Sequence, residues 1–302
     1  MNWSVFAHPG GPLEPHDLWT AWNFDLWLLI PLGVTVFIYI GGIWNVWQRA
    51  GVGRGISIRR CASFIGGILA LSVALVSPLD ALSNILFSAH MTQHLILILV
   101  AAPLLVMSNF VVAIFGVLPR GWAQALGHGL NQSQALSRTW QVLSHPVSAW
   151  LLFAIPLWAW HAPTLYEAAL QDETIHTLEH LGFLVTAMLF WWVLFKNTTQ
   201  KHVHYGMAIP YLFTTVLHSG ILGALMTFTS QPWYPYYTTL VPLWGLTPLQ
   251  DQQLAGLIMW LPGGTVFTLL TIGYFAAWLR ALEQRSLRLQ RPDSLKTRHE
   301  LK

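Results

Sequence analysis

The lysines and arginines of this chain occupy only every second gap between its long apolar runs. All fifteen fall within residues 49–60, 120–138, 196–201 and 280–302. The other gaps carry acidic residues and contain no Lys or Arg. Lys and Arg are retained on the cytoplasmic side when a membrane protein inserts. The pattern therefore predicts a membrane-spanning chain with its amino terminus outside and its carboxyl terminus in the cytoplasm.

The apolar runs are long enough for seven membrane helices. A hydrocarbon core of about 30 Å needs about 20 helical residues, and 54% of the chain is hydrophobic while 9% is charged. The predicted spans lie near residues 24–47, 61–82, 84–107, 146–166, 174–195, 205–229 and 252–279. Residues 108–118 are also apolar, and either extend the third helix or lie along the inner interface. We expect an all-α integral membrane protein.

The same pattern divides the chain into a periplasmic segment at 1–23, a seven-helix membrane domain at 24–279 and a basic cytoplasmic tail at 280–302. The first segment lacks the basic start and apolar stretch of a cleavable signal peptide. The tail is more typical of a surface that faces anionic lipid than of one that binds nucleic acid. The single cysteine, Cys61, excludes an internal disulfide and a CxxC metal motif.

Six of the thirteen histidines lie inside or at the edge of predicted helices. His90-Met-Thr-Gln-His94 and His176-Thr-Leu-Glu-His180 share the spacing i, i+4, which places two imidazoles on one helical face. Both pairs open helices that run inward, and His161 ends a helix that runs outward. These five histidines are therefore expected at one depth, in the outer leaflet.

Three further residues complete the predicted site. His218 lies near the middle of the sixth predicted span, Asp251 begins the seventh, and Met259 lies two turns deeper on the same face. Ionisable side chains at membrane depth are costly unless paired, and they mark function by default. The candidate metal ligands are His90, His94, His161, His176, His180, His218, Asp251 and Met259. Glu179 and Gln93 are candidates for groups that orient these ligands from behind.

The type of metal follows from the ligand chemistry. Neutral imidazoles, with thioethers available from Met91, Met226 or Met259, suit copper and in particular Cu(I), whereas hard cations require several carboxylates. Zinc is compatible with the same imidazoles. A b-type haem held between imidazoles of facing helices, as in an electron carrier, is an alternative. A structural network of hydrogen bonds between helices, without metal, is another.

The sequence supports an enzyme less well than a metal-binding protein. His176-Thr-Leu-Glu179-His180 matches the H-x-x-E-H pattern of one class of metallopeptidases. Such enzymes need a further acidic ligand and an aqueous cleft, whereas this motif opens a membrane helix. The sequence contains no Gly-rich phosphate loop and no nucleophile elbow. We expect a protein that is not an enzyme.

Several separated motifs, in order along residues 20–280, resemble one family. They are His90-Met-Thr-Gln-His94-Leu, Trp160-His161-Ala-Pro-Thr-Leu-Tyr166, His176-x-x-Glu-His180, Tyr236-Tyr237 and Asp251-Gln-Gln-Leu-Ala-Gly-Leu-Ile-Met-Trp260. This set is similar to the CtaG family of bacterial, caa3-type cytochrome c oxidase assembly factors. Unrelated copper chaperones that share the CtaG name have one membrane anchor and paired cysteines, which this chain lacks.

The resemblance implies a protein of the bacterial plasma (inner) membrane that helps to assemble a respiratory haem-copper oxidase. It implies a copper chaperone that supplies copper to the copper centre of oxidase subunit I. An outer-leaflet imidazole site would accept Cu(I) for this purpose from a periplasmic carrier. The expected partners are therefore subunit I, the carrier and the lipid bilayer, and not nucleic acid. A haem-binding electron carrier and a metal-free assembly scaffold are the alternatives.

Overall fold

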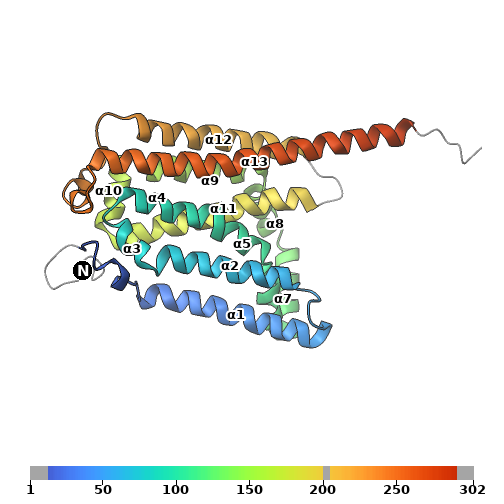
Figure 1. The fold of residues 1–302 in the computed structure, drawn as a ribbon. Helices are drawn as coiled ribbons and strands as arrows, with labels where there is room; N and C mark the ends of the chain where they lie inside the picture. Colours follow the sequence, from blue (N-terminus) through green and yellow to red (C-terminus); the bar gives the residue numbers. More distant parts are fainter. Residues whose placement is uncertain (1–12, 200–204, 291–302) are drawn as a thin grey trace, which may run out of the picture.

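A computed structural model describes residues 13–199 and 205–290, and these residues form a bundle of antiparallel helices (Figure 1). The chain passes along the bundle in α1 (Leu26–Ala50), α2 (Ile58–Leu75), a composite third helix, α9 (Pro146–Trp160), α11 (Glu173–Thr199), α12 (Tyr205–Phe228) and α13 (Pro248–Gln290). The composite helix consists of α4 (Phe87–Leu95), the π-helix η3 (Ile96–Ala101) and α5 (Ala102–Met107). The part of the chain described here has no strand. The prediction of an all-α fold is confirmed.

Six of these passes are individually long and apolar enough to cross a membrane. The fourth, α9, meets this criterion only together with α8 (Gln134–Leu143), from which it is bent by 64°. The fold therefore has six to seven candidate spans. The first described residues and the end of α13 lie at opposite ends of the bundle (Figure 1). Which end faces the cytoplasm stays a prediction, and we call the end at which α4 and α11 begin the predicted outer end.

Two predicted spans end earlier than expected, in both cases because of a proline. The span predicted at 61–82 ends at Leu75, and Pro78 starts the separate helix α3 (Pro78–Ser83). The span predicted at 146–166 ends at Trp160, and Pro163 starts α10 (Pro163–Gln171). Proline has no N–H and disfavours helical geometry in the residue before it. As a result, two short helices lie across the predicted outer end.

The other boundaries differ by a few residues. The third span begins at Phe87 and not at residue 84, and the seventh begins at Pro248 and continues to Gln290. The short 3-10 helices η2 (Leu18–Thr20), η4 (Pro235–Thr238) and η5 (Val241–Trp244) lie at the predicted outer end (Figure 1). The loop between α12 and α13 therefore covers the same end of the bundle as α3 and α10.

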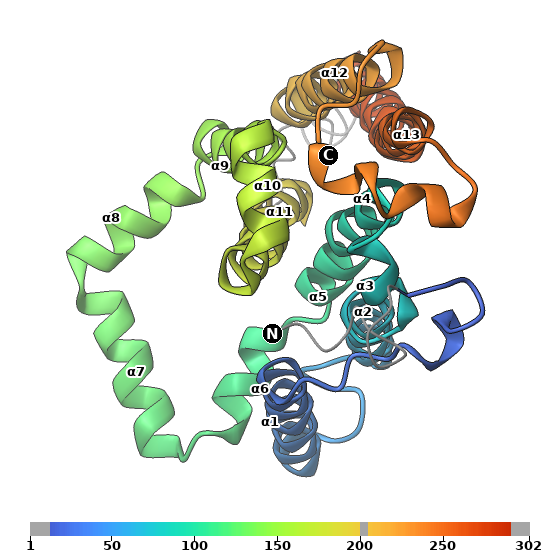
Figure 2. The ribbon, with the colours of Figure 1, turned by 90° about the vertical axis from the view of Figure 1, so that its left-hand side faces the viewer.

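Residues 108–118 do not extend the third helix. Asn109 adopts a left-handed conformation with φ of 59°, and a new helix, α6 (Phe110–Val117), then packs on α1. Asn45 of α1 donates a hydrogen bond to the carbonyl of Gly116 at 3.1 Å. Next, α7 (Arg120–Gln132) and α8 form an arc beside the bundle (Figure 2). Trp122 and Trp140 are exposed on this arc, as is typical of amphipathic helices at a membrane interface.

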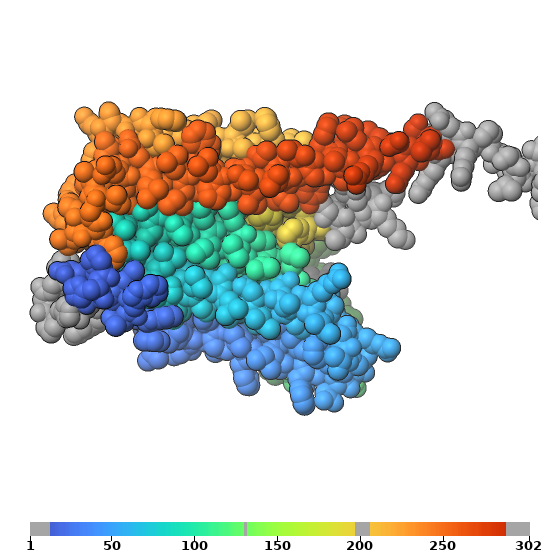
Figure 3. All heavy atoms as spheres, viewed as in Figure 1, coloured from blue at the N-terminus to red at the C-terminus, as the bar shows by residue number. Residues whose placement is uncertain are grey.

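Among the described residues, the most extensive contact between two helices is that of α12 with α13. A Cβ atom at Gly256 would lie 2.7 Å from the carbonyl oxygen of Gly223, so only glycine fits at this contact. Figure 3 shows α13 as a ridge along one face of the bundle, extending past its end. The small residues next to His218 predict that another helix packs closely there; they are Ser219, Gly220, Gly223 and Ala224. That neighbour is α13, whereas the His218 ring itself contacts α9.

Candidate metal centre

The two histidine pairs lie on facing helices, α4 and α11, near the start of each helix. The start of α11 is fixed by its own sequence, because a carboxylate oxygen of Asp172 accepts hydrogen bonds from the N–H groups of Thr174 (2.8 Å) and Ile175 (3.1 Å). These bonds lower the pKa of Asp172 below its ordinary value. A short polar side chain that binds the first free N–H groups is what defines a helix N-terminus.

The start of α4 is fixed from another helix. Asp251 of α13 is fully buried, and it accepts hydrogen bonds from the backbone N–H groups of Phe87 (2.6 Å) and Ser88 (3.2 Å) and from the Ser88 hydroxyl. The sequence predicts Asp251 as a ligand. In the structure its carboxylate caps the helix that carries His90 and His94.

The four imidazoles of His90, His94, His176 and His180 are packed ring against ring. Within the pairs, the ring centroids lie 4.2 Å apart for α4 and 4.3 Å apart for α11. Across the two helices, His90 lies 5.3 Å from His176, and His94 lies 5.2 Å from His180. Ring nitrogens of His90, His94 and His180 lie within 4.8 Å of one another. Three imidazole donors are therefore close enough to share one metal ion.

A carboxylate lies beside these rings. Glu179 Oε1 is 3.6 Å from His90 Nε2 and 3.7 Å from His94 Nε2. Potential ligand atoms of His90, His176 and Glu179 form a second group within 4.8 Å, so the two groups share His90. The sequence predicts Glu179 as an orienting group, and its position suits either that role or direct contact with an ion.

The polar atoms of this cluster are shielded from solvent and have no hydrogen-bond partner. They are both ring nitrogens of His90 and His94, Nε2 of His176 and His180, and both carboxylate oxygens of Glu179. Buried polar groups in proteins are nearly always paired, and each unpaired one costs about 1–3 kcal/mol. So many unpaired donors and acceptors in one place would be costly unless a further group, such as a cation, contacts them.

Two predicted site residues point elsewhere. Gln93 donates hydrogen bonds to the carbonyl of Ala74 (2.7 Å) and to Asp80 (2.9 Å), so its amide faces α2 and α3 and not the imidazoles. His218 packs against Trp150 of α9, with ring centroids 5.2 Å apart and nearly perpendicular. It belongs to neither of the two ligand groups found among the described residues.

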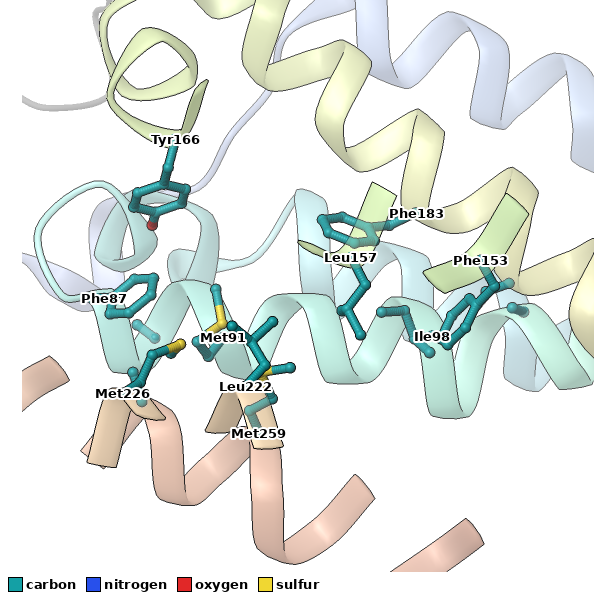
Figure 4. Close-up of a cluster of buried hydrophobic side chains, with 14 of the residues drawn as sticks. Phe87, Met91, Ile98, Phe153, Leu157, Tyr166, Phe183, Leu222, Met226 and Met259 are labelled. Carbon is teal, nitrogen blue, oxygen red and sulfur yellow. The ribbon is translucent and has the colours of Figure 1, made fainter. Parts of the chain in front are cut away.

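His161 and Met259 lie next to the cluster. Both line a cavity of about 40 Å³ between α4, α9, α12 and α13, and His94 lines the same cavity. His161 contacts the sulfur of Met91, with Nε2 and Sδ 3.4 Å apart. Figure 4 shows Met91, Met226 and Met259 in this part of the core, coming from α4, α12 and α13.

Aromatic side chains cover the predicted outer side of the imidazoles. The Tyr166 ring lies 5.1 Å from the His90 ring and perpendicular to it, and its hydroxyl is 2.7 Å from that of Tyr237. Tyr234 donates a hydrogen bond to the carbonyl of His161 at 2.9 Å. Burial raises the pKa of Tyr234 and of Tyr237 above the ordinary value, so both stay protonated. Figure 4 shows Tyr166 above Phe87, which belongs to the same cover.

The sequence does not predict this aromatic cover. Tyr236, Tyr237 and Tyr166 occur in motifs of the sequence, but nothing in those motifs indicates that the side chains lie over the imidazoles. The available signal was the concentration of tyrosines in segments that face the same side of the membrane as the histidine pairs.

A comparison with known families decides the identity of the chain. Residues 37–281 match the family described as "Cytochrome c oxidase caa3 assembly factor", and this match includes all the histidines of the cluster. The chain belongs to this family. The resemblance found in the sequence motifs is therefore confirmed.

The chain also matches longer proteins. It is 28% identical over 273 residues to an uncharacterized protein of Mycobacterium bovis and, equally, to one of Mycobacterium tuberculosis. It is 25% identical over 292 residues to an uncharacterized protein of Mycobacterium leprae. These matches cover 85–92% of this chain but only 40–43% of the relatives. The chain thus spans about two fifths of their length. No solved structure matches it.

Proposed function

We propose that this assembly factor binds copper at the cluster of His90, His94, His176 and His180 and supplies it to the copper centre of oxidase subunit I. One observation carries the proposal: three imidazole donors from two facing helices lie within 4.8 Å of one another, and both ring nitrogens of His90 and His94 and Nε2 of His180 have no hydrogen-bond partner. The family supplies the context of oxidase assembly.

The donor set supports a transition metal. Imidazole nitrogen binds copper and zinc well, whereas magnesium and calcium require mostly oxygen ligands. Glu179 is the one carboxylate in the two ligand groups. Because both groups contain His90, an ion can move from one to the other by exchanging one ligand at a time. Such stepwise exchange is what transfer of copper from a periplasmic carrier to subunit I requires.

The packing of the rings argues against the haem alternative. Sites for drug-sized ligands and cofactors enclose about 300–1,000 Å³, whereas the cavity beside His94 measures about 40 Å³. A metal-free scaffold would leave these ring nitrogens and the carboxylate oxygens of Glu179 without a hydrogen-bond partner. A small cation accounts for both features.

Metal analysis of the purified protein tests the proposal. The wild-type protein, loaded with Cu(I) without oxygen, should retain stoichiometric copper and show no Soret absorption band. Replacing His90 and His94 together by Ala should abolish retention, because it removes two of the three clustered donors. His218→Ala is the matched control, since that ring packs on Trp150 outside the cluster. Equal loss of copper in both variants, or a Soret band, would contradict the proposal. His202 and His204, a histidine pair in a predicted cytoplasmic loop, would be a second control, but they lie outside the described residues.

Deletion of the protein tests its role in cells. A strain without it should contain oxidase subunits that lack copper and activity, and added copper should partly restore activity by mass action. A deletion strain whose oxidase keeps its full copper content under copper limitation would refute delivery.

A further inference from the structure

The protonation state of His161 can be assigned from its contacts. Its Nδ1 lies 2.6 Å from the carbonyl oxygen of Leu157, and a carbonyl can only accept, so Nδ1 carries the proton. A positively charged imidazole would be buried here without an adjacent counter-ion, since Glu179 lies beside His90 and His94. His161 is therefore neutral, and its Nε2 carries an unshared lone pair.

This bare nitrogen faces a sulfur that has no proton either. Nε2 of His161 and Sδ of Met91 are 3.4 Å apart, and both residues are buried. Neither atom can donate, so the contact is not a hydrogen bond. At this distance the two atoms are in van der Waals contact, and both lone pairs remain free to bind a cation. The separation suits a shared cation: in a tetrahedral zinc site, with nitrogen at about 2.0 Å and sulfur at about 2.3 Å from the ion, the two donor atoms are about 3.5 Å apart.

A further methionine and a cavity lie beside this contact. Met259 lines the same cavity of about 40 Å³ as Met91 and His161, and a cavity of about 10–15 Å³ already holds a water-sized occupant. Met226, which is fully buried, belongs to the same core cluster (Figure 4). Thioether sulfur is a soft, neutral ligand that favours Cu(I) over hard cations, whereas zinc in proteins takes imidazole, thiolate and carboxylate ligands.

We propose that Met91, His161 and Met259 form a second site, specific for a monovalent soft cation, which we call the thioether site. The inference rests on the proposed function, in which Cu(I) is the cargo. His94 is common to both sites, because it belongs to the imidazole cluster and also lines the cavity. Cu(I) moves from the cluster through His94 to the thioether site by ligand exchange, without a change of oxidation state. A divalent ion that is bound by the imidazoles does not move on to the thioether site. The thioether site thereby selects Cu(I) over divalent ions.

X-ray absorption at the copper edge, together with affinity measured against a Cu(I) chelator, tests the thioether site on the full-length protein. Copper in the wild-type protein should show sulfur as well as nitrogen neighbours. Met91→Leu, which conserves volume, should remove a sulfur neighbour and weaken Cu(I) binding about 10-fold or more, the scale on which metal sites respond to lost support. Binding of Zn(II) should not change, because zinc uses the imidazole cluster.

Met188→Leu is the matched control, because Met188 is packed against the core but does not line the cavity. It should leave the spectrum and both affinities unchanged. Copper with nitrogen neighbours only in the wild-type protein would overturn the thioether site and leave the imidazole cluster standing. If the double variant His90→Ala/His180→Ala still bound copper through sulfur and its Zn(II) binding were also unchanged, metal binding by the imidazole cluster would instead be refuted. Equal loss of Zn(II) and Cu(I) binding in Met91→Leu would show a general disruption and refute a separate site.

Discussion

Replacing Asp251 by Ala should destabilise the first turn of α4 and, with it, the arrangement of His90 and His94. The carboxylate accepts hydrogen bonds from two buried backbone N–H groups, those of Phe87 and Ser88. A buried donor left without a partner costs about 1–3 kcal/mol. With two such donors, we expect the free energy of unfolding to fall by about 2–6 kcal/mol. Loss of an ordinary helix cap costs only about 0.5–2 kcal/mol.

The matched comparison is Asp172→Ala, which removes the cap of the other histidine helix. Asp172 is exposed, so water can replace its two hydrogen bonds to backbone N–H groups and the loss of stability should be smaller. Asp251→Asn keeps one acceptor oxygen and should lie between the wild-type protein and Asp251→Ala. Thermal and denaturant unfolding of the detergent-solubilised variants measures the differences. Copper affinity, measured in parallel, should fall with the stability of α4, because His90 lies three residues after Phe87.

The two assays together separate a cap from a ligand. If Asp251→Ala lost copper while its unfolding transition stayed at the wild-type position, Asp251 would be a ligand, as the sequence alone suggested. If it unfolded like Asp172→Ala and kept its copper, the capping argument would be refuted.

Three further results are expected. Gly256→Ala should destabilise the α12–α13 contact by about 1–3 kcal/mol, the usual cost of overpacking, while Gly273→Ala, with open space around it, should not; equal unfolding curves would contradict this. Burial raises the pKa of Asp80, which lies in α3 outside the candidate spans, from 3.8 to about 6. Below about pH 4, Asp80 is protonated in the folded and in the unfolded chain, and its burial is then least costly. As pH rises through 6, burial of the ionised carboxylate costs about 3 kcal/mol, so the stability of the wild-type protein relative to Asp80→Asn should fall between pH 4 and pH 7. Reporter fusions at positions 55, 130, 200 and 295 should read cytoplasmic and those at 10, 82, 170 and 240 periplasmic; two on the wrong side would refute the predicted orientation.

The histidine pairs could be predicted from the sequence because their geometry is local. The spacing i, i+4 fixes two rings on one helical face whatever surrounds the helix, and that is where His90, His94, His176 and His180 lie. The apolar runs fixed the helices for the same reason. The breaks after Leu75 and Trp160 were signalled by Pro78 and Pro163, but hydrophobicity alone does not distinguish a broken helix from a continuous one.

The remaining features depend on contacts between distant parts of the chain. Asp251 lies 164 residues from the N–H group of Phe87 that it caps, and Met91 lies 70 residues from the His161 ring. No periodicity in the sequence encodes which face of α13 meets α4. Gln93 shows the same limit, since it shares a helix turn with the histidines but its amide faces α2 and α3.

The length of α13 has a mechanical consequence. Its 43 residues measure about 64 Å at 1.5 Å per residue, whereas a bilayer with its headgroups is about 40–45 Å thick. One continuous rod therefore carries Asp251 near one end and Arg280 and Arg285 near the other. A displacement of the projecting end along the helix axis would therefore also displace Asp251, which caps α4. Pro262 is the point at which the rod bends most easily, because it lacks the N–H of a regular helical turn. The two ends of the bundle are thereby coupled through one helix, from the projecting end of α13 to the imidazoles at the predicted outer end.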